Sequence, residues 1–343
     1  MPYILWTKKE GVGKIPTNIP LKDAMVFLQK KKLVAEPINS LVGPWQTRLA
    51  ADEYFLKIKG KNNYRAFLGA NGNPYGIFWL EIKHVFFDGS ILIRNLAEKG
   101  RKRIPRLEER IESDLVYPAI RGKDIQRWKV DLEIYMLVVQ DPETRKGYPE
   151  EFLKNNYPRT FVYLTRFREI LLERPLYKKF YADKKAPFYS QFNISKSTFS
   201  NFKVVWKIMT NDLVTAVVSQ VKTPIGWKAV IPLHTTAFIP TDNELEAHYL
   251  CAIINSKPVR DFVKSFSSAG RGFGTPSVME HIGIPKFDPK NELHLKLAEI
   301  SKRCHQLKAE GKEEEIRELE NENDELVKEL FGITFIGDRD DLE

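Results

Sequence analysis

The amino-acid sequence predicts an α+β protein in which a mixed-sheet domain precedes a C-terminal helical hairpin. Short apolar segments separated by turn residues follow one another from Asp52 to Pro289, a texture typical of strands mixed with a few helices. After Pro289 the apolar residues recur at spacings of three and four, which indicates helices. The chain has 343 residues, of which 43% are hydrophobic, so it is long enough for two domains and can bury a core.

Changes in composition divide the chain into four segments. We expect an N-terminal helical segment over residues 1–40 and the mixed-sheet domain over residues 41–289, where a subdivision near residue 130 stays open. A helical hairpin or arm should follow over residues 290–334, and residues 335–343 form an acidic tail.

The first expected element is a short amphipathic helix over Pro20–Lys32. Apolar residues from Leu21 to Leu28 stand at i, i+3, i+4 and i+7, the spacing of one helical face. The lysines Lys30–Lys32 suit the negative C-terminal end of such a helix. Contact of these lysines with DNA is the alternative.

Three strands are expected next, two of them joined in a hairpin. The first is Glu53–Lys59, and the hairpin strands Phe78–Phe87 and Ile91–Ile93 flank the tight-turn dipeptide Asp88-Gly89.

A basic loop follows the hairpin. The stretch KGRKRIPRLEER over Lys99–Arg110 contains Arg101, Lys102 and Arg103 and is broken by Pro105. Cations on a loop that leaves a hairpin suit contact with phosphates. An exposed loop without a ligand is the alternative interpretation.

A strand and a basic turn are expected over Leu115–Trp128. The apolar strand Leu115–Tyr117 is expected to end at Pro118, and Gly122 permits the turn that follows by its conformational freedom. In one interpretation Arg121 and Asp124 form a buried pair that fixes the turn. In the other, the three cations held close together here contact phosphates. They are Arg121, Lys123 and Arg127.

A helix and an aromatic segment come next. Pro158–Arg174 is predicted as one helix, and Tyr177–Phe202 mixes tyrosines and phenylalanines with lysines. Aromatic and cationic side chains together suit nucleic acid, through base stacking and phosphate contacts. Lys184 and Lys185 are therefore candidate contacts, although most of the aromatics are expected in the core. Two buried strands should follow, Lys203–Met209 and Ala229–Pro232.

The stretch Thr241–Phe287 is predicted to form one compact unit. Thr241 and Glu244 match a capping box at the start of a helix. This helix should end near Asn255, because Pro258 disfavours helix in the residue before it and suits the first turn of a second helix.

A glycine loop, Gly270–Gly274, follows the second helix of this unit. A glycine loop that binds a cofactor should follow a strand and open a helix, so no cofactor site is expected here. Glycine allows close backbone approach, and we expect Arg271 to reach a DNA groove. The short strand His281–Pro285 leads out of the unit.

The residues after Pro289 are predicted to form a helical hairpin or coiled-coil arm. Gly311 separates two apolar stripes, and Asn323 occupies an inward position in the second. Whether Asn323 sets a pairing within the chain or with another chain stays open. The acidic outer face argues against DNA contact and favours docking on a protein.

Charge is unevenly distributed along the chain. Glu310–Glu343 holds 14 acidic and 4 basic side chains, a net of −10, so the other residues carry +19 within the total of +9. A basic body with an acidic tail points to an anionic polymer as partner. A generally basic protein whose charges are only solvated is the alternative.

Several classes of protein are not indicated. No apolar run approaches the ~20 residues of a membrane helix, and the N-terminus lacks the pattern of a signal peptide. Cys251 and Cys304 have no CxxC spacing, so neither a zinc site nor a disulfide framework is suggested, and both are expected in the core. We therefore expect a cytoplasmic protein without a membrane partner.

Four phrases resemble the target-recognition domain of adenine-specific DNA methyltransferases of the TaqI-like and type IIG restriction-modification class. They are YLCAIINSKPV, SVMEHIGIPKF, the string Tyr-Pro-x-x-Arg-Gly-x-Asp-Ile that begins at Tyr117, and the ending NENDELVKELFGIT. The resemblance runs from about Ala50 to about Thr334. It implies a specificity domain for duplex DNA, with C-terminal helices that pack on a DNA methyltransferase domain or subunit.

The resemblance implies that catalysis resides elsewhere. An adenine methyltransferase needs a tight Asn/Asp-Pro-Pro-Tyr/Phe turn to hold the flipped base, whereas this chain has only Asn73-Pro74-Tyr75. S-adenosylmethionine is therefore expected on a catalytic partner, with no cofactor in this chain. The chain is either a piece of a longer enzyme or a separate subunit.

The primary hypothesis is a DNA recognition module without catalytic or metal-binding residues of its own. One alternative is a magnesium-dependent DNA nuclease that acts through Glu81 and Lys83. Another is a protein-interaction remnant that uses the acidic hairpin and no longer binds DNA. In the primary hypothesis the DNA contacts are Arg101, Lys102, Arg103, Arg121, Lys123, Arg127, Lys184, Lys185 and Arg271.

Overall fold

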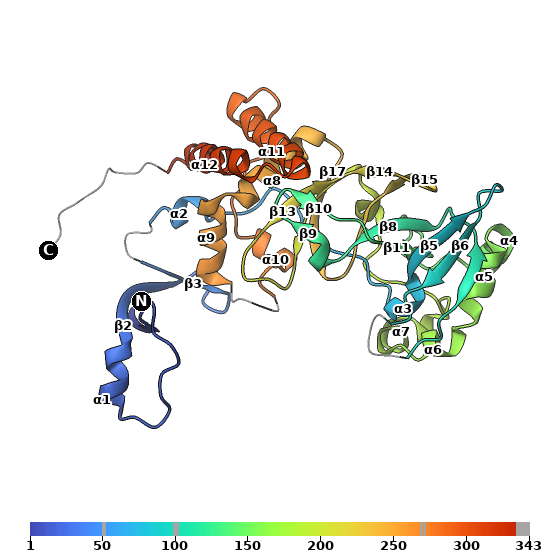
Figure 1. Ribbon diagram of the computed structural model, residues 1–343, viewed down its shortest axis with the longest axis horizontal. Coiled ribbons are helices and arrows are strands. Elements are labelled where there is room, and N and C mark those ends of the chain that lie inside the picture. The colour runs from blue at the N-terminus through green and yellow to red at the C-terminus, as the bar shows by residue number, and fades with distance from the viewer. Residues whose placement is uncertain (50–52, 99–102, 268–269, 271, 334–343) are drawn as a thin grey trace.

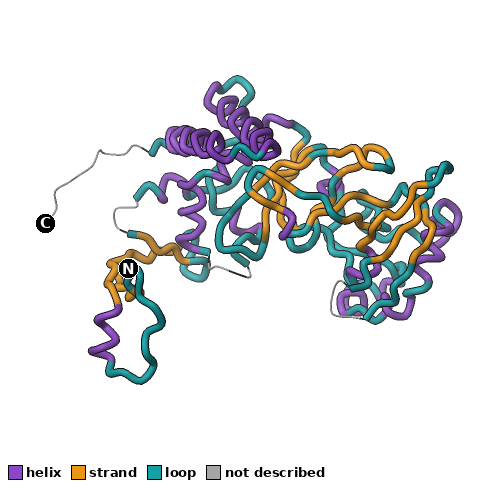
Figure 2. Tube along the Cα trace, in the orientation of Figure 1, coloured by secondary structure: helices purple, strands orange, loops and turns teal. Residues whose placement is uncertain are grey.

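The computed structural model describes residues 1–49, 53–98, 103–267, 270 and 272–333. The protein belongs to the α+β class, as predicted. Figure 1 shows an elongated molecule in which an N-terminal sheet projects at one end and a sheet with helices beside it forms the other. The C-terminal helices lie along the upper edge in this view, and Figure 2 shows the strands running through the middle.

The N-terminal segment is mainly β-structure. Strands β1 (Pro2–Lys8), β2 (Leu28–Pro37) and β3 (Trp45–Arg48) form an antiparallel sheet in that order. The helix predicted over residues 20–32 is wrong beyond Phe27, since only α1 (Leu21–Ala24) and the 3-10 turn η1 (Met25–Phe27) are helical.

Strand pairing explains this difference from the prediction. Lys30 to Lys32 lie in β2 opposite Trp6 to Ile4, and the Lys30 ammonium stands 4.9 Å from the centre of the Trp6 ring. The apolar and aromatic residues of β1 favour β-structure, and β1 pairs with β2 over all seven of its residues. An isolated amphipathic helix would have had no apolar partner here.

A six-stranded mixed sheet forms the other end of the molecule. Its order is β16-β8-β11-β5-β6-β7; β16 runs parallel to β8 and the remaining neighbours are antiparallel. The predicted hairpin is confirmed, because β5 pairs with β6 and Gly89 in the turn has φ +80°. The strands are β5 (Trp79–Val85), β6 (Ile91–Asn95), β7 (Glu108–Ile111), β8 (Val116–Ile120), β11 (Ile134–Leu137) and β16 (Ile231–Pro232).

Short helices lie beside this sheet, and α4, α5 and α6 contribute side chains to its apolar core. The single helix predicted over Pro158–Arg174 is divided into two, with Arg166 and Phe167 between them. Phe167 is 1% exposed, so the break turns its ring into the core. The helices are α4 (Glu150–Asn156), α5 (Pro158–Thr165), α6 (Arg168–Leu172) and α7 (Pro175–Phe180), and the one-turn α3 (Tyr75–Phe78) precedes β5.

A four-stranded antiparallel sheet of order β13-β12-β17-β4 forms the middle. The buried strand predicted at Lys203–Met209 is confirmed as β12. The strand predicted at Glu53–Lys59 is wrong, because α2 (Phe55–Ile58) buries Phe55 and Ile58 on one helical face. The sheet contains β4 (Phe67–Leu68), β12 (Phe202–Lys207), β13 (Thr215–Val218) and β17 (Thr236–Thr241). Two small antiparallel pairs flank it, β9 (Ile125–Gln126) with β10 (Lys129–Val130) and β14 (Gln220–Thr223) with β15 (Gly226–Ala229).

The unit after β17 contains α8 (Glu244–Asn255), α9 (Lys257–Phe266) and α10 (Pro276–Met279). The two predicted helices and their boundary at Asn255 are confirmed. The N-cap is Asn243 rather than Thr241, since the Asn243 side chain accepts from the Glu246 amide at 3.1 Å. The strand predicted at His281–Pro285 is reduced to one bridge between Ile282 and Lys59.

Helices α11 (Glu292–Glu310) and α12 (Glu313–Leu330) form the predicted hairpin, with Gly311 at φ +77° between them. The hairpin shares one apolar core with α8 and α9, so it is part of the body rather than a free arm. The pairing of Asn323 is within the chain, because its Nδ2 donates to the Ala252 carbonyl of α8 at 2.9 Å. The acidic tail predicted over residues 335–343 lies outside the described residues.

Two expectations about other segments can be compared with the structure. Cys251 and Cys304 are free thiols with no exposed surface, as expected of core residues. Among the described helices, none combines the length and the apolar character needed to cross a membrane.

Candidate nucleic-acid interface

The basic loop before β7 is described only in part. Arg101 and Lys102 lie outside the described residues, whereas Arg103 is exposed at the start of the described portion. Asn95 of β6 anchors this portion: its Nδ2 donates to the Pro105 carbonyl at 2.9 Å and its Oδ1 accepts from the Leu107 amide at 2.7 Å. The loop therefore presents Arg103 to solvent from a fixed base.

Arg121 lies in a buried ion pair. It precedes the 3-10 turn η2 (Gly122–Asp124), and its Nε and Nη2 donate to the two carboxylate oxygens of Asp124 at 2.7 and 2.8 Å. The Arg121 amide also donates to Asp124 Oδ2 at 2.8 Å, and the two residues are 7% and 3% exposed. This geometry favours the interpretation in which the pair fixes the turn.

Lys123 projects from the same turn into solvent. Its side chain is 62% exposed, and its ammonium lies 2.8 Å from Glu133 Oε2. Hydrogen bonds from Lys123 and then from Arg121 lower the pKa of Glu133. Exposed pairs of this kind contribute little to stability, so Lys123 can exchange Glu133 for another anion at small cost.

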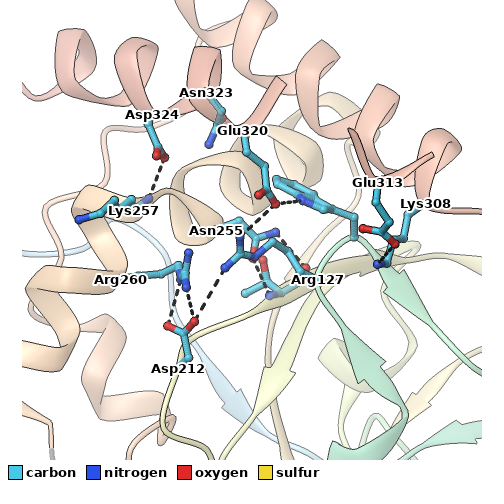
Figure 3. A network of polar contacts seen from close by, with 12 residues as sticks. Arg127, Asp212, Asn255, Lys257, Arg260, Lys308, Glu313, Glu320, Asn323 and Asp324 are labelled. Carbon is cyan, nitrogen blue, oxygen red and sulfur yellow. Dashed lines mark hydrogen bonds and ion pairs between the residues drawn. The ribbon is translucent and has the colours of Figure 1, made fainter. Parts of the chain in front are cut away.

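Arg127 joins the β-rich body to the C-terminal hairpin. Its Nη1 donates to Glu320 of α12 at 3.0 Å, and the indole of Trp128 donates to the same carboxylate oxygen at 2.7 Å. Figure 3 shows Arg127 between Glu320 and Asp212, the latter 3.8 Å from Arg127 Nη2. The guanidinium is thus held by two carboxylates of its own chain.

Asp212 extends this network to α9. Arg260 Nε donates to it at 3.0 Å and the Lys264 ammonium lies at 2.9 Å, as Figure 3 shows for Arg260. Burial would raise the pKa of Asp212, but hydrogen bonds from Arg260 and Lys264 hold it below its ordinary value. The network explains why Arg260 and Lys264 lie off the apolar stripe of α9.

Lys184 and Lys185 form an exposed basic turn after α7. Lys184 ends the 3-10 turn η3 (Ala182–Lys184), and Lys185 has φ +49°. The amide of Lys184 donates to the Tyr181 carbonyl at 3.1 Å. This hydrogen bond connects the backbone of the basic turn to that of Tyr181. Neither lysine forms an ion pair with another described residue.

A hollow of about 270 Å³ opens beside Tyr181, where the two large sheets meet. Its walls come from β4, β17, the loop after β11 and the segment that follows α7. Two arginines and four rings line it, and no Asp or Glu does. The side chains that determine its chemistry are Arg65, Phe67, Arg145, Tyr181, Phe192 and Phe238.

The sequence did not single out Arg65 or Arg145. Each stands in a short loop without a periodic pattern, and the two are brought together only by the meeting of the sheets. Tyr181 and Phe192 belong to the aromatic segment that the sequence did identify. The expectation that most of its aromatics are core is met only in part: Tyr177, Phe188 and Tyr189 are buried, whereas Phe180 is exposed and Tyr181 and Phe192 are half-buried.

The glycine loop is explained in part by packing. A Cβ on Gly274 would lie 2.1 Å from the Lys207 carbonyl oxygen, and the Trp206 indole donates to the Gly274 carbonyl at 2.8 Å. Glycine therefore lets the loop lie directly on β12. Arg271, the predicted groove contact, lies outside the described residues.

The residues of the nuclease alternative form an ion-pair cluster. Glu81 accepts from Lys83 at 3.0 Å and also pairs with Arg94 of β6. The Lys83 hydrogen bond is the largest cause that lowers the pKa of Glu81. No group of three or more His, Cys, Asp or Glu that could hold a metal ion occurs among the residues described.

The chain was compared with known proteins. No family model matches it, and no curated protein does. Among solved structures it is similar to the type IIL restriction-modification enzyme MmeI in complex with DNA, with a TM-score of 0.47 and 10% identity. The match covers 82% of this chain and 35% of the MmeI chain, so this chain spans well under half of that enzyme.

Proposed function

We propose that this chain is the DNA-recognition module of an adenine-specific methylation or restriction-modification system. The separation of charge carries the proposal: the residues before Glu310 have a net charge of +19 and those from Glu310 onward −10. A body so basic has a favourable electrostatic interaction with the phosphates of duplex DNA. The phrases that resemble target-recognition domains support the same assignment.

The cations proposed to contact phosphates are those that are free to do so. Lys184 and Lys185 have no ion pair among described residues, and Arg103 is exposed. Lys123 is 62% exposed; its nearer partner, Glu133, is exposed, and the buried Asp124 lies farther away at 3.7 Å. Arg101, Lys102 and Arg271 remain proposed contacts from the sequence. Arg121 and Arg127 are proposed to stabilise the fold rather than to contact DNA, because their guanidinium groups are paired with carboxylates of the chain.

The proposal assigns the acidic face of α12 to a protein partner. Glu318, Glu322, Glu325 and Glu329 are exposed on this helix and would repel DNA. A DNA methyltransferase domain or subunit that docks there would supply S-adenosylmethionine and the chemistry. Capture of such a subunit by the wild-type chain, lost when these four glutamates are changed to lysine, would support this part of the proposal.

The Lys184–Lys185 turn provides a test of the DNA contacts. We expect Lys184→Ala/Lys185→Ala to weaken binding to random duplex DNA without changing the unfolding midpoint. Each lost phosphate contact should reduce the slope of log affinity against log salt by about 0.9, so the double variant should lose about 1.8. Fluorescence anisotropy over a salt series measures this slope.

The matched control removes two lysines at the start of the hairpin, one just before α11 and one within it. Lys290 and Lys296 are exposed and have no ion pair with another described residue. Lys290→Ala/Lys296→Ala changes the net charge equally but should leave the slope within about 0.5 of wild type, because these residues adjoin the acidic hairpin. Equal loss in both variants would show that only net charge matters and would remove the turn from the interface.

The two other hypotheses have their own tests. A nuclease would cleave DNA in the presence of magnesium and lose this activity in Lys83→Ala; against it, both carboxylate oxygens of Glu81 are engaged, by Lys83 and Arg94. A protein-interaction remnant would capture a methyltransferase and show no affinity for DNA at low salt.

A further inference from the structure

The hollow between the two large sheets differs in charge from the hollow between α9 and α12. The space between α9 and α12, about 570 Å³, is lined by four carboxylates: Asp261, Glu322, Asp324 and Glu325. The hollow beside Tyr181 has two guanidinium groups and no carboxylate in its lining. Two arginines without a carboxylate make this hollow suited to an anion, and its size suits one small ligand.

Two arginines at its rim have no competing anion. Arg65 and Arg145 are exposed and form no ion pair with another described residue. The Arg65 guanidinium lies 5.1 Å from the centre of the Phe67 ring, a cation–π contact that orients it while leaving its N–H groups available. Guanidinium groups bind phosphate through two parallel hydrogen bonds, so a phosphate is the anion that this rim fits.

The rings of the lining supply a stacking surface. Tyr181 and Phe192 stack on each other at 4.8 Å with 27° between their planes, and both are half-buried. Phe67 and Phe238, which also line the hollow, stack at 5.8 Å. A planar aromatic ligand gains stacking contact on such rings, and nucleic-acid bases do so irrespective of sequence.

The backbone around these side chains is held in place by buried polar groups. Gln140 Nε2 donates to the Arg145 carbonyl at 2.7 Å, and Gln140 Oε1 accepts from the Gln191 amide at 2.9 Å. Phe192 is fixed by backbone hydrogen bonds to Asn71 at 2.9 and 3.2 Å. The loop with Arg145 and the segment with the stacking rings are thus tied to each other, and the site requires little ordering when a ligand binds.

We propose that this hollow binds a single nucleotide, with its base against the Tyr181–Phe192 pair and its phosphate between Arg65 and Arg145. In a DNA complex the nucleotide would be one displaced from the duplex stack, and in this form the inference rests on the proposed function. The Lys184–Lys185 turn, bonded to the Tyr181 backbone, would hold the flanking phosphates. A free nucleoside monophosphate has the same chemistry and is distinguished by experiment.

The test uses calorimetry with the full chain and the double variant Arg65→Gln/Arg145→Gln. Deoxyadenosine 5′-monophosphate should bind wild type about tenfold more tightly than deoxyadenosine or inorganic phosphate, because it engages both ends of the site. The double variant should lose this advantage. Arg317→Gln, which removes an exposed guanidinium from α12, is the matched control and should retain it.

A second arm identifies the source of the nucleotide. An unpaired nucleotide leaves the duplex stack at lower cost than a paired one. A duplex with one bulged nucleotide should therefore bind wild type at least about fivefold more tightly than a fully paired duplex, and the double variant should bind both equally.

The outcomes separate this inference from the proposed function. Binding of mononucleotide that the arginine substitutions abolish, in a chain that binds no DNA, supports the site and refutes DNA recognition. Binding of DNA with a steep salt dependence, without any response to mononucleotide, bulge or arginine substitution, overturns the nucleotide site and leaves DNA recognition standing.

Discussion

Arg121 is the residue at which a functional and a structural interpretation can be separated. Its guanidinium makes two hydrogen bonds to Asp124, which is 3% exposed and also caps the turn through the Arg121 amide. Without Arg121, the buried carboxylate of Asp124 would lose its closest counter-charge and two hydrogen bonds, which is costly in a low-dielectric environment.

We therefore expect Arg121→Ala to lower the free energy of unfolding by about 3–5 kcal/mol. Urea unfolding followed by circular dichroism measures this loss. Lys123→Ala in the same turn should change stability by less than about 0.5 kcal/mol, because its pair with Glu133 is exposed. An Arg121→Ala protein of unchanged stability that binds DNA weakly would instead make Arg121 a direct contact.

Lys203 is a second residue whose burial should affect the free energy of unfolding. It has no exposed surface, and its ammonium donates to the Ser200 carbonyl at 2.8 Å. Burial lowers the pKa of Lys203 from 10.5 to about 7. Between pH 7 and 10.5 the unfolded chain retains a proton that the folded chain has lost, so stability rises with pH across this window. The full penalty is present below pH 7.

Lys203→Met should accordingly stabilise the protein at pH 7, by about 1–3 kcal/mol, because it removes a buried charge and retains the side-chain length. The advantage should shrink as the pH approaches 10, which unfolding curves at pH 7, 8.5 and 10 would reveal. A less stable variant at pH 7 would mean that the hydrogen bond to Ser200 outweighs the cost of burial.

At the scale of elements, the docking of α11 on the body depends on a neutral histidine. His305 Nε2 accepts from the Val217 amide of β13 at 2.9 Å, and its Nδ1 lies 2.7 Å from the Ser301 carbonyl, to which it donates. A protonated ring would place an N–H against the Val217 N–H. Burial lowers the pKa of His305 to about 4. The neighbouring His248 has a pKa lowered to about 3 by burial and by repulsion from His305 and Lys302.

Stability should therefore fall as the pH drops below 6.5. The unfolded histidines bind protons there while the folded ones stay neutral, and each contributes a slope of up to about 1.4 kcal/mol per pH unit. Urea unfolding at pH 7.0, 6.0 and 5.0 tests this expectation. His305→Gln should reduce the slope by about one histidine's share, and an unchanged slope would show that His305 titrates normally.

The elements also show what the sequence can and cannot predict. Helices α8, α9, α11 and α12 were predicted because their stripes, caps and breaking residues are local signals. The helix predicted over residues 20–32 forms only as far as Phe27, because the pairing of β2 with β1 and β3 makes the rest of that segment a strand. Likewise Arg127 meets Glu320 across 193 residues of sequence, a contact that no local pattern reveals.

The same distinction applies to the candidate site. Lys184 and Lys185 stand out as a basic run within an aromatic segment, and the structure leaves them exposed. Arg65 and Arg145 have no such run around them, and only the meeting of two sheets places them in one hollow. Side chains gathered from separate loops are the part of a binding site that a single sequence does not show.

For the whole molecule, the segregation of charge has a structural counterpart. The acidic α12 packs on the body through Ile316, Asn323 and Val327, so its acidic residues remain on the outside. Arg127 and the cluster around Asp212 neutralise the junction itself. The outward-facing carboxylates of α12 thus stand apart from the basic residues earlier in the chain, as the proposed contacts with DNA and with a protein partner require.

The most direct test of DNA recognition is fluorescence anisotropy of the purified chain with a labelled random duplex from 50 to 300 mM salt. We expect log affinity to fall linearly with log salt, with a slope of at least about −4, as for a protein that contacts several phosphates. Absence of binding at 50 mM salt, or an affinity independent of salt, would contradict the proposal that the basic body is a DNA-binding surface.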